Sequence, residues 1–249
     1  MKPLFSIITV TFNAEKELPF TINSVKEQTY KEFEYLVIDG NSKDNTIEIA
    51  KNSGIRDVII ISEKDKGLYD AMNKGIKQAS GKYLIFLNAG DSFSSEKTLE
   101  TIAQKAVDTN GDILYGQTRL INSNRVVVGM RHLTAPEYLT FESFKNGMLV
   151  CHQAFIVKKD IAPQYNLKYR FSADYEWCII CLKRSKKNVY INEIIIDYLT
   201  AGMTDKNHKK SLRERFDIMC KYYGTIPTIL KHILFIPRFI KEKYRRKTI

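Results

Sequence analysis

Tyr83-Leu84-Ile85-Phe86-Leu87-Asn88-Ala89-Gly90-Asp91 is the stretch of sequence that decides the fold. Its first five residues are apolar and rich in aromatic and branched side chains, which predicts a strand buried on both faces of a sheet. In an open α/β sheet, ligands bind beyond the carboxyl ends of the strands. Asp91 stands at this exit, where a lone carboxylate suits a hard divalent cation that also contacts phosphate oxygens. The alternative is that Asn88 and Asp91 only cap the next helix.

The same alternation continues on both sides of this stretch. Runs of β-branched and aromatic residues predict strands at 5–12, 33–39, 57–62 and 112–115. Apolar residues at helical spacing predict helices at 15–28, 44–52, 69–79 and 97–107. Strands and helices that alternate through short loops predict an α/β fold, with a doubly wound, mostly parallel sheet and helices on both of its faces.

No glycine-rich phosphate loop follows the first strand, and the P-loop pattern is also missing from the sequence. Polar residues stand there instead: Thr9, Thr11 and Asn13 near the end of the first strand, and Asp39 at the end of the second. A carboxylate at a strand end can accept a hydrogen bond from a base N–H or a ribose hydroxyl. We therefore expect a nucleotide to bind without a glycine cradle.

Four motifs resemble, in order and spacing, those of family 2 glycosyltransferases: residues 6–13 (SIITVTFN), 37–46 (VIDGNSKDNT), 66–75 (KGLYDAMNKG) and 84–91 (LIFLNAGD). The resemblance covers roughly residues 3–204 and is closest to the branch that builds bacterial surface polysaccharides. It implies the GT-A fold, a nucleotide-diphosphate sugar donor and inversion at the anomeric carbon. We expect a nucleotide-sugar-binding half at 1–117, an acceptor-binding half at 118–204, and a basic amphipathic helical tail at 205–249.

The resemblance also assigns the donor side of the site. It places the base and ribose against Thr9, Phe12, Asn13 and Asp39, where Asp39 would read the uracil edge and so favour UDP. Two residues of the third motif, Gly67 and Asp70, join these as expected donor contacts.

Asn88 and Asp91 fall on the family's acidic motif, which helps Mn²⁺ or Mg²⁺ hold the diphosphate, with Asp91 as the expected metal ligand. The motif usually offers two or three carboxylates, whereas this chain has Asn88, Gly90 and a single Asp91. Met72 also departs from the family, which often has a basic residue at that position.

The acceptor side begins with His152 and Gln153, at the start of a strand predicted at 151–157. They are candidate substrate contacts, although a lone histidine is more often structural. The resemblance matches Asp174 to the family's general base, which takes the proton of the acceptor hydroxyl. The alternatives are an acid that only favours a helix N-terminus, or Glu176 as the base.

An inverting transfer is one displacement at the anomeric carbon, so it needs one base and positive charge near the departing diphosphate. The expected acceptor is a hydroxyl of a saccharide or of a lipid-linked molecule in surface polysaccharide synthesis. The alternative function is a catalytically inactive protein of the same fold that binds nucleotide sugar, for which the thinned acidic motif argues.

The formal net charge of +11 is concentrated at the C-terminus. Residues 205–249 hold 13 Lys or Arg against 4 Asp or Glu, a net charge of +9, and residues 1–204 carry only +2. Apolar residues at helical spacing in this tail suggest a helix that lies on an anionic membrane; the alternative is a helix packed on the domain. The nearly neutral body and the lack of a nucleic-acid motif argue against a specific nucleic-acid partner.

The sequence predicts a cytoplasmic protein, with peripheral attachment to the inner face of the membrane through the tail left open. Met1-Lys2-Pro3 leads directly into a strand-like segment and does not form a signal peptide. No apolar run approaches the roughly 18 residues that span a bilayer. The four cysteines are then expected to stay reduced. Cys178 and Cys181 lie in one apolar stretch of helix, which favours core thiols over a metal site.

Overall fold

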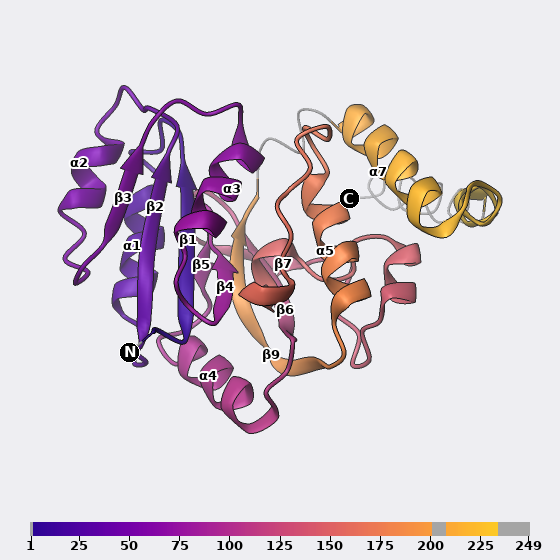
Figure 1. Ribbon diagram of the computed structural model, residues 1–249. Helices are drawn as coiled ribbons and strands as arrows, with labels where there is room; N and C mark the ends of the chain where they lie inside the picture. The colour runs from indigo at the N-terminus through magenta and orange to yellow at the C-terminus, as the bar shows by residue number, and fades with distance from the viewer. Residues whose placement is uncertain (1, 201–207, 234–249) are drawn as a thin grey trace.

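Strand β4 (Tyr83–Phe86) lies inside a nine-stranded mixed sheet of this computed structural model, which describes residues 2–200 and 208–233. It lies beside β1 on one side (Figure 1) and pairs with β8 on the other. The five side chains from Tyr83 to Leu87 are fully buried. The prediction of a strand covered on both faces is therefore confirmed.

Four parallel strands form the first half of the sheet, in the order β3-β2-β1-β4. Their remaining bounds are β1 (Phe5–Thr11), β2 (Phe33–Asp39) and β3 (Ile59–Ser62). The helices between them are α1 (Leu18–Lys26), α2 (Thr46–Lys51) and α3 (Leu68–Gln78). Helices α1 and α2 contact each other, whereas α3 packs on β1 and β2 and leads back to β4. The doubly wound arrangement is confirmed for this half.

The second half of the sheet is mixed, because β8 inserts antiparallel between β4 and β6. Its strands are β5 (Ser92–Phe93), β6 (Ile113–Ile121), β7 (Val127–Met130), β8 (Phe155–Lys158) and β9 (Asn188–Leu199). The strand expected from Cys151 starts only at Phe155, since residues 152–154 form the 3₁₀ turn η2. Strand β6 crosses the division expected between 117 and 118, so both halves share one sheet.

The other helices surround this second half. They are α4 (Thr98–Thr109), α5 (Ala173–Arg184) and α7 (His208–Tyr223), with 3₁₀ turns η1 (Phe141–Asn146) and η3 (Lys159–Ile161). Cys178 and Cys181 are buried and free within α5, so the prediction of core thiols is confirmed for this pair. No helix among the described residues combines the length and hydropathy needed to cross a membrane.

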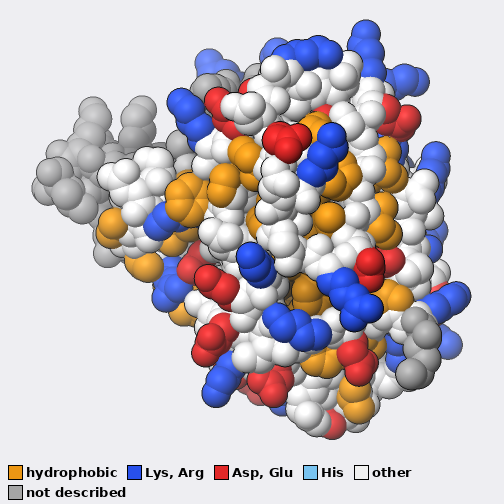
Figure 2. Space-filling view, turned by 90° about the vertical axis from the view of Figure 1, so that its left-hand side faces the viewer, with side chains coloured by type: hydrophobic (Ala, Val, Ile, Leu, Met, Phe, Trp, Pro, Cys, Tyr) orange, Lys and Arg blue, Asp and Glu red, His pale blue; other side chains and the backbone are white. Residues whose placement is uncertain are grey.

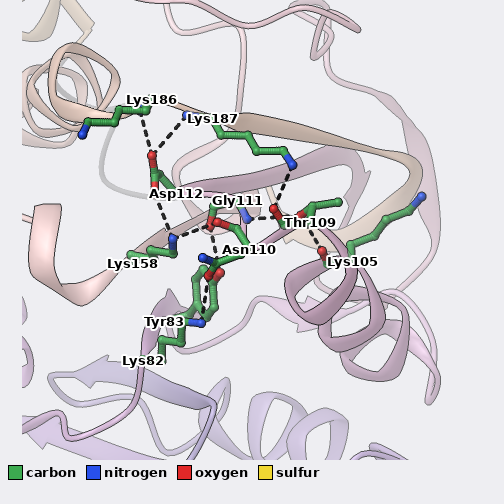
Figure 3. A network of polar contacts seen from close by, with 10 residues as sticks. All are labelled: Lys82, Tyr83, Lys105, Thr109, Asn110, Gly111, Asp112, Lys158, Lys186 and Lys187. Atoms are coloured by element: carbon green, nitrogen blue, oxygen red, sulfur yellow. Dashed lines mark hydrogen bonds and ion pairs between the residues drawn. The ribbon is translucent and has the colours of Figure 1, made fainter.

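Lysine side chains gather at the end of the sheet where β4, β6 and β9 begin (Figure 3). Lys158 Nζ donates to Asn110 O and Lys187 Nζ donates to Thr109 O, both at 2.8 Å. These carbonyls end α4, where the helix dipole is negative and ammonium groups are favourable. Asp112 accepts from Lys158 Nζ at 2.9 Å, so one carboxylate offsets part of this positive charge. The lysines therefore have a structural role at this end of the sheet.

Acidic and basic side chains are interspersed over the face of the molecule that carries α2 and β3 (Figure 2). This agrees with the near-neutral charge of the first 204 residues. The basic cluster of residues 241–247 lies outside the described residues.

Helix α7 holds the start of α5 through buried polar contacts. Glu176 of α5 is 1% exposed and accepts from Lys221 Nζ at 2.7 Å and from Tyr222 Oη at 3.0 Å. Two turns earlier in α7, Glu214 Oε2 accepts from the backbone N–H of Phe171, just before α5 begins, at 2.8 Å. The C-terminal helix thus fixes the segment that carries Asp174.

We predict that Glu176→Gln lowers stability, because the neutral amide keeps an acceptor but loses the charge opposite Lys221. A hydrogen bond to a charged group is worth about 1.5–3 kcal/mol, and about 1 kcal/mol of this should be lost here because Lys221 is half exposed. Calorimetry should show Tm lower by roughly 2–4 °C. Glu142→Gln is the control, because its ion pair with Lys145 is largely exposed and should be worth less than about 0.5 kcal/mol. Equal effects of the two variants would contradict the prediction.

Candidate active site

The carboxyl ends of β1, β2 and β3 are joined by the carboxylate of Asp39. Its Oδ1 accepts from Thr11 Oγ1 at 3.0 Å, and its Oδ2 accepts from Ser62 Oγ at 2.7 Å. Ser42 donates to it twice, through its backbone N–H at 2.9 Å and its hydroxyl at 2.5 Å. Burial pushes the pKa of Asp39 up, but these hydrogen bonds outweigh burial and hold the pKa below its ordinary value. Asp39 is therefore an ionised structural group as well as a candidate donor contact.

An aromatic ring and a fixed loop stand beside Asp39. The side chain of Phe12 is 65% exposed, and a Cβ placed on Gly40 would lie 3.3 Å from Phe12 Cδ2. Asn13, with φ of 50°, donates its N–H to Ser42 Oγ at 2.8 Å and accepts from Lys43 N at 2.9 Å. The structure thus brings Phe12 and Asn13 together with Asp39, as expected. An exposed ring beside a carboxylate can stack on a base.

Thr9 does not join this group. Its side chain is fully buried, its hydroxyl donates to Leu87 O at 2.7 Å, and it accepts from Tyr35 Oη at 3.0 Å. Both hydrogen bonds lie within the core of the sheet. The expected contact between Thr9 and the donor is therefore corrected to a role in holding β1 against the exit of β4.

Gly67 and Asp70 shape the turn that begins α3. Gly67 has a φ of 116°, which favours glycine, and space is open within 4 Å of where its Cβ would be. Asp70 Oδ2 accepts from Lys66 N at 3.0 Å, which satisfies a free N–H at the helix start. Asp65 accepts from Gly67 N at 2.8 Å, and its other oxygen lies against Gly40. This turn therefore adds Asp65, which the sequence analysis did not select, to the edge that carries Asp39.

Asp91 lies at the exit of β4 and connects it to two distant segments. Its Oδ1 accepts from Leu199 N at 3.0 Å, and its Oδ2 accepts from Gln153 Nε2 at 2.8 Å. Burial raises the pKa of Asp91 to about 7, although both hydrogen bonds and the charge of Arg125 oppose the rise. A cation at this carboxylate would favour its ionised form.

The oxygens at this exit are hard ligands suited to Mg²⁺ or Mn²⁺. Each carboxylate oxygen of Asp91 keeps accepting capacity beyond its one hydrogen bond. Asn88 Oδ1 is buried without a hydrogen-bond partner in the described part of the chain. Residues 2–200 and 208–233 hold no cluster of three His, Cys, Asp or Glu that could bind a metal alone. The residues therefore fit a metal that shares its coordination with phosphate oxygens and water, and do not form a closed protein site.

Arg125 is the cation that the structure places against this loop. It follows β6, has a φ of 63°, and donates from Nη1 to Gly90 O at 2.5 Å. Its guanidinium lies 3.9 Å from the ring centroid of Phe20 in α1. Burial lowers the pKa of Arg125, while the charges of Asp91, Glu17 and Asp197 oppose this. It therefore supplies positive charge beside the single acid of the thinned motif.

His152 is packed inside an aromatic cluster below the site. Its ring lies 5.1 Å from Phe86 and 5.5 Å from Trp177, and Nε2 is 2.6 Å from Tyr165 Oη. Burial lowers the pKa of His152 to about 4, so the ring is neutral at pH 7. These contacts favour the structural alternative for His152, whereas the neighbouring Gln153 reaches Asp91.

Asp174 stands in the first turn of α5 with one oxygen held and one open. Its Oδ1 accepts from Tyr69 Oη at 3.0 Å and from Tyr175 N at 2.9 Å. No described residue donates a hydrogen bond to Oδ2. Glu176 differs in both respects, because it is buried and bound to α7. Of the two acids, Asp174 has the geometry of a base that can accept a proton from outside.

Sequence reasoning missed three residues at this site, and two of them carried a signal. Asp65 lies two residues before Gly67 and just after a predicted strand, which is the signal that selected Asp39 before Gly40. Tyr69 lies within a motif already singled out. Arg125 had no local signal, because its contact with Gly90 spans 35 residues.

Solved structures of glycosyltransferases share this fold. Residues of this chain match Staphylococcus aureus TarS 1-349 in complex with UDP-GlcNAc with a TM-score of 0.69 at 19% identity, over 94% of this chain and 73% of that one. They match the mannosyltransferase PcManGT from Pyrobaculum calidifontis, in complex with GDP-Man and Mn²⁺, with a TM-score of 0.63 at 11% identity, over 94% and 75%. The GT-A fold expected from the motifs is confirmed.

Sequence relatives extend over most of the chain. A PGL/p-HBAD biosynthesis glycosyltransferase of Mycobacterium bovis is 34% identical over 225 residues, which cover 84% of each chain. The Escherichia coli UDP-Glc:alpha-D-GlcNAc-diphosphoundecaprenol beta-1,3-glucosyltransferase WfgD is 27% identical over 219 residues, 87% of this chain and 85% of WfgD. The family model for glycosyl transferase family 2 matches residues 6–165, which include Asp39, Asp91 and His152. The chain belongs to glycosyl transferase family 2.

Proposed function

We propose that this protein is an inverting glycosyltransferase that moves a sugar from a nucleotide-diphosphate donor, with UDP favoured, to a hydroxyl of a saccharide or lipid-linked acceptor. One observation carries the proposal. Asp39 ends β2, Asp91 lies beyond β4 and Asp174 lies at the start of α5. Of the three, only Asp174 has an oxygen without a donor from the described residues. The names of the relatives support a role in glycolipid or surface polysaccharide synthesis.

The donor binds the edge of residues 1–117 in this proposal. Phe12 stacks on the base. Asp39 accepts a hydrogen bond from the polar edge of the base, and Asn13 donates one to it. Gly67 lets the ligand approach the start of α3. Asp70 holds that turn in place. UDP and UDP-GlcNAc complexes of TarS support this assignment by similarity of fold.

Family members with this fold commonly use a divalent metal, and PcManGT is complexed with Mn²⁺. In this chain, Asp91 is the proposed protein ligand, with Asn88 Oδ1 beside it. A bound Mn²⁺ or Mg²⁺ would neutralise charge on the departing diphosphate. Gln153 orients the Asp91 carboxylate, and Arg125 adds a fixed positive charge next to it.

The acceptor binds the half formed by residues 118–204. Asp174 Oδ2 accepts the hydroxyl proton while the acceptor oxygen attacks the anomeric carbon from the side opposite the diphosphate. The bond between that carbon and the diphosphate oxygen breaks in the same step, so the configuration inverts. His152 supports this half from below, through Tyr165.

The inactive alternative is not favoured, since the proposed base is present with a free oxygen and the named relatives are enzymes. Hydrolysis and transfer assays over a panel of nucleotide sugars, with and without Mn²⁺, test the proposal directly. UDP binding without transfer to any acceptor in a broad panel would support the alternative.

The base assignment predicts a specific loss in Asp174→Asn, because the amide keeps the shape but cannot accept the proton. Transfer should fall by roughly 10²–10⁴, with the loss in kcat and not in KM for the donor. UDP affinity by calorimetry should be unchanged. Glu176→Gln is the comparison: assayed below its Tm, it should keep kcat within about threefold because its carboxylate faces α7. If Asp174→Asn is active and Glu176→Gln is inactive, the base is Glu176 and the assignment to Asp174 is wrong.

For Asp91→Asn we expect opposite effects on binding and on stability. Mn²⁺ affinity in the presence of UDP should fall sharply. Wild-type Asp91 keeps its proton to about pH 7 in the folded protein, but the unfolded chain releases it near pH 4, so its contribution to stability falls as pH rises from 4 to 7. Asparagine cannot ionise, so the variant should gain up to about 4 kcal/mol over wild type at pH 8 and little at pH 4. Full activity of the wild type in EDTA would disprove the metal role.

The tail is proposed to bind an anionic membrane surface. In the described helical segment 225–233, Ile226, Ile229, Leu230 and Ile233 are 73%, 44%, 59% and 55% exposed, whereas Thr228 is buried. One helix face is therefore apolar and open, beside basic residues that attract anionic lipid at about 1 kcal/mol each. The body and the tail divide near residue 205 in this proposal.

Ile226→Ser/Leu230→Ser should weaken sedimentation with phosphatidylglycerol vesicles at least about tenfold, because two exposed apolar side chains lose their burial in the interface. Binding should also fade with salt, and donor hydrolysis should persist. Val107→Ser, at an equally exposed valine of α4, is the matched control. If intact protein ignores such vesicles at low salt, the tail has a purely structural role.

A further inference from the structure

Helix α3 presents two side chains to the acceptor half from one face. Tyr69 and Asn73 are four residues apart, so they lie on the same side of the helix. Both are buried. Tyr69 Oη reaches Asp174, 105 residues away, and Asn73 reaches the backbone of Tyr165, 92 residues away. The helix that begins in the donor half therefore contacts the proposed base directly.

The Tyr69 hydroxyl decides which oxygen of Asp174 is available. Tyr69 Oη and Tyr175 N both donate to Oδ1, at 3.0 and 2.9 Å. Oδ2 receives no donor from the described residues. Burial, the charge of Asp174 and the hydrogen bond to it raise the pKa of Tyr69 well above its ordinary value, so the phenol keeps its proton and remains a donor.

The position of Tyr69 is itself fixed by stacking. Its ring stacks on Tyr165 with centroids 5.5 Å apart, and Tyr165 stacks on Trp177 at 5.1 Å. Asn73 binds both backbone groups of Tyr165, donating to its O at 3.0 Å and accepting from its N at 2.7 Å. His152 Nε2 lies 2.6 Å from the Tyr165 hydroxyl. The Tyr69 ring, whose hydroxyl binds Asp174, is therefore held by described neighbours that form no hydrogen bond with Asp174.

We infer that Tyr69 is a positioning residue for the transfer reaction, whose hydroxyl fixes the Asp174 carboxylate by Oδ1 and leaves Oδ2 for the acceptor. This rests on the proposed role of Asp174 as the base. A hydrogen bond to one oxygen limits the rotation of the carboxylate, so Tyr69 lowers the entropy that is lost when the acceptor hydroxyl aligns with Oδ2.

Other groups near Asp174 must stay unchanged in a test of the Tyr69 hydroxyl. Those whose charges interact with it are His152 of η2, Tyr165 before α5, Cys178 of α5 and Tyr198 of β9. Arg215 of α7 acts on Tyr69. A variant that removes only the Tyr69 hydroxyl leaves all of them in place.

Tyr69→Phe in the full chain is that variant, because it keeps the stacked ring. The kcat of transfer should fall about tenfold, because the carboxylate is no longer held by Oδ1 while Oδ2 takes the proton. KM for the donor and UDP affinity should be unchanged.

Tyr83→Phe is the matched control. It removes a hydroxyl from an equally buried tyrosine whose Oη donates to Gly111 O at 2.8 Å, at the opposite end of the sheet. It should lower stability about as much as Tyr69→Phe and leave kcat at the wild-type value. A second readout is the double variant Tyr69→Phe/Asp174→Asn, which should be no slower than Asp174→Asn alone, because the Tyr69 hydroxyl acts through the base.

Equal kcat values in Tyr69→Phe and Tyr83→Phe would overturn the inference while leaving the glycosyltransferase proposal intact. A loss of kcat that is confined to Tyr69→Phe, and that disappears when Asp174 is already replaced by Asn, supports it. If Asp174→Asn transfers sugar at the wild-type rate, the base assignment fails, and the inference fails with it.

Discussion

The site depends on the hydrogen bonds of the Asp91 carboxylate, because they connect three segments that are far apart in the sequence. The carboxylate lies at the exit of β4, accepts from Gln153 in η2, and accepts from Leu199 at the end of β9. Burial keeps its pKa near 7, so the folded protein holds this acid in an unfavourable place. A buried polar group is retained at such a cost where it is fully bonded or where a ligand completes it. Each oxygen of Asp91 accepts one hydrogen bond in the free protein, and its remaining accepting capacity is suited to a ligand.

The two ends of the sheet have opposite chemistry for a simple geometric reason. Parallel strands begin together and end together, so loops that precede them share one edge and loops that follow share the other. At the first edge, lysines neutralise the carbonyls that end α4 (Figure 3). At the other edge stand the carboxylates of Asp39, Asp65 and Asp91. A diphosphate beside these acids would be stabilised by the positive charge of Arg125 and of a divalent metal.

Much of the first half could be predicted from sequence, since its strands are continuous apolar runs and its helices have a clear period. Thr9 could not be placed, because β1 is buried on both faces and alternation then no longer separates core from ligand side. The antiparallel insertion of β8 was missed because pairing between Leu84 and Val157 leaves no local trace in sequence. The structural role of Glu176, which the sequence analysis named as the alternative base, was missed for the same reason: Lys221 of α7 is 45 residues away.

The acidic motif has a single carboxylate, and the backbone at Gly90 gives a structural reason for this. The missing carboxylates are therefore weak evidence for lost activity. Gly90 has a φ of 98°, a conformation that side-chain-bearing residues rarely adopt. A Cβ there would lie 2.6 Å from Leu199 Cδ2, in the residue whose N–H binds Asp91. An aspartate at position 90 would therefore strain the backbone and make the Leu199 side chain move. Glycine fits this backbone, and Arg125, bonded to Gly90 O, supplies positive charge beside the single carboxylate.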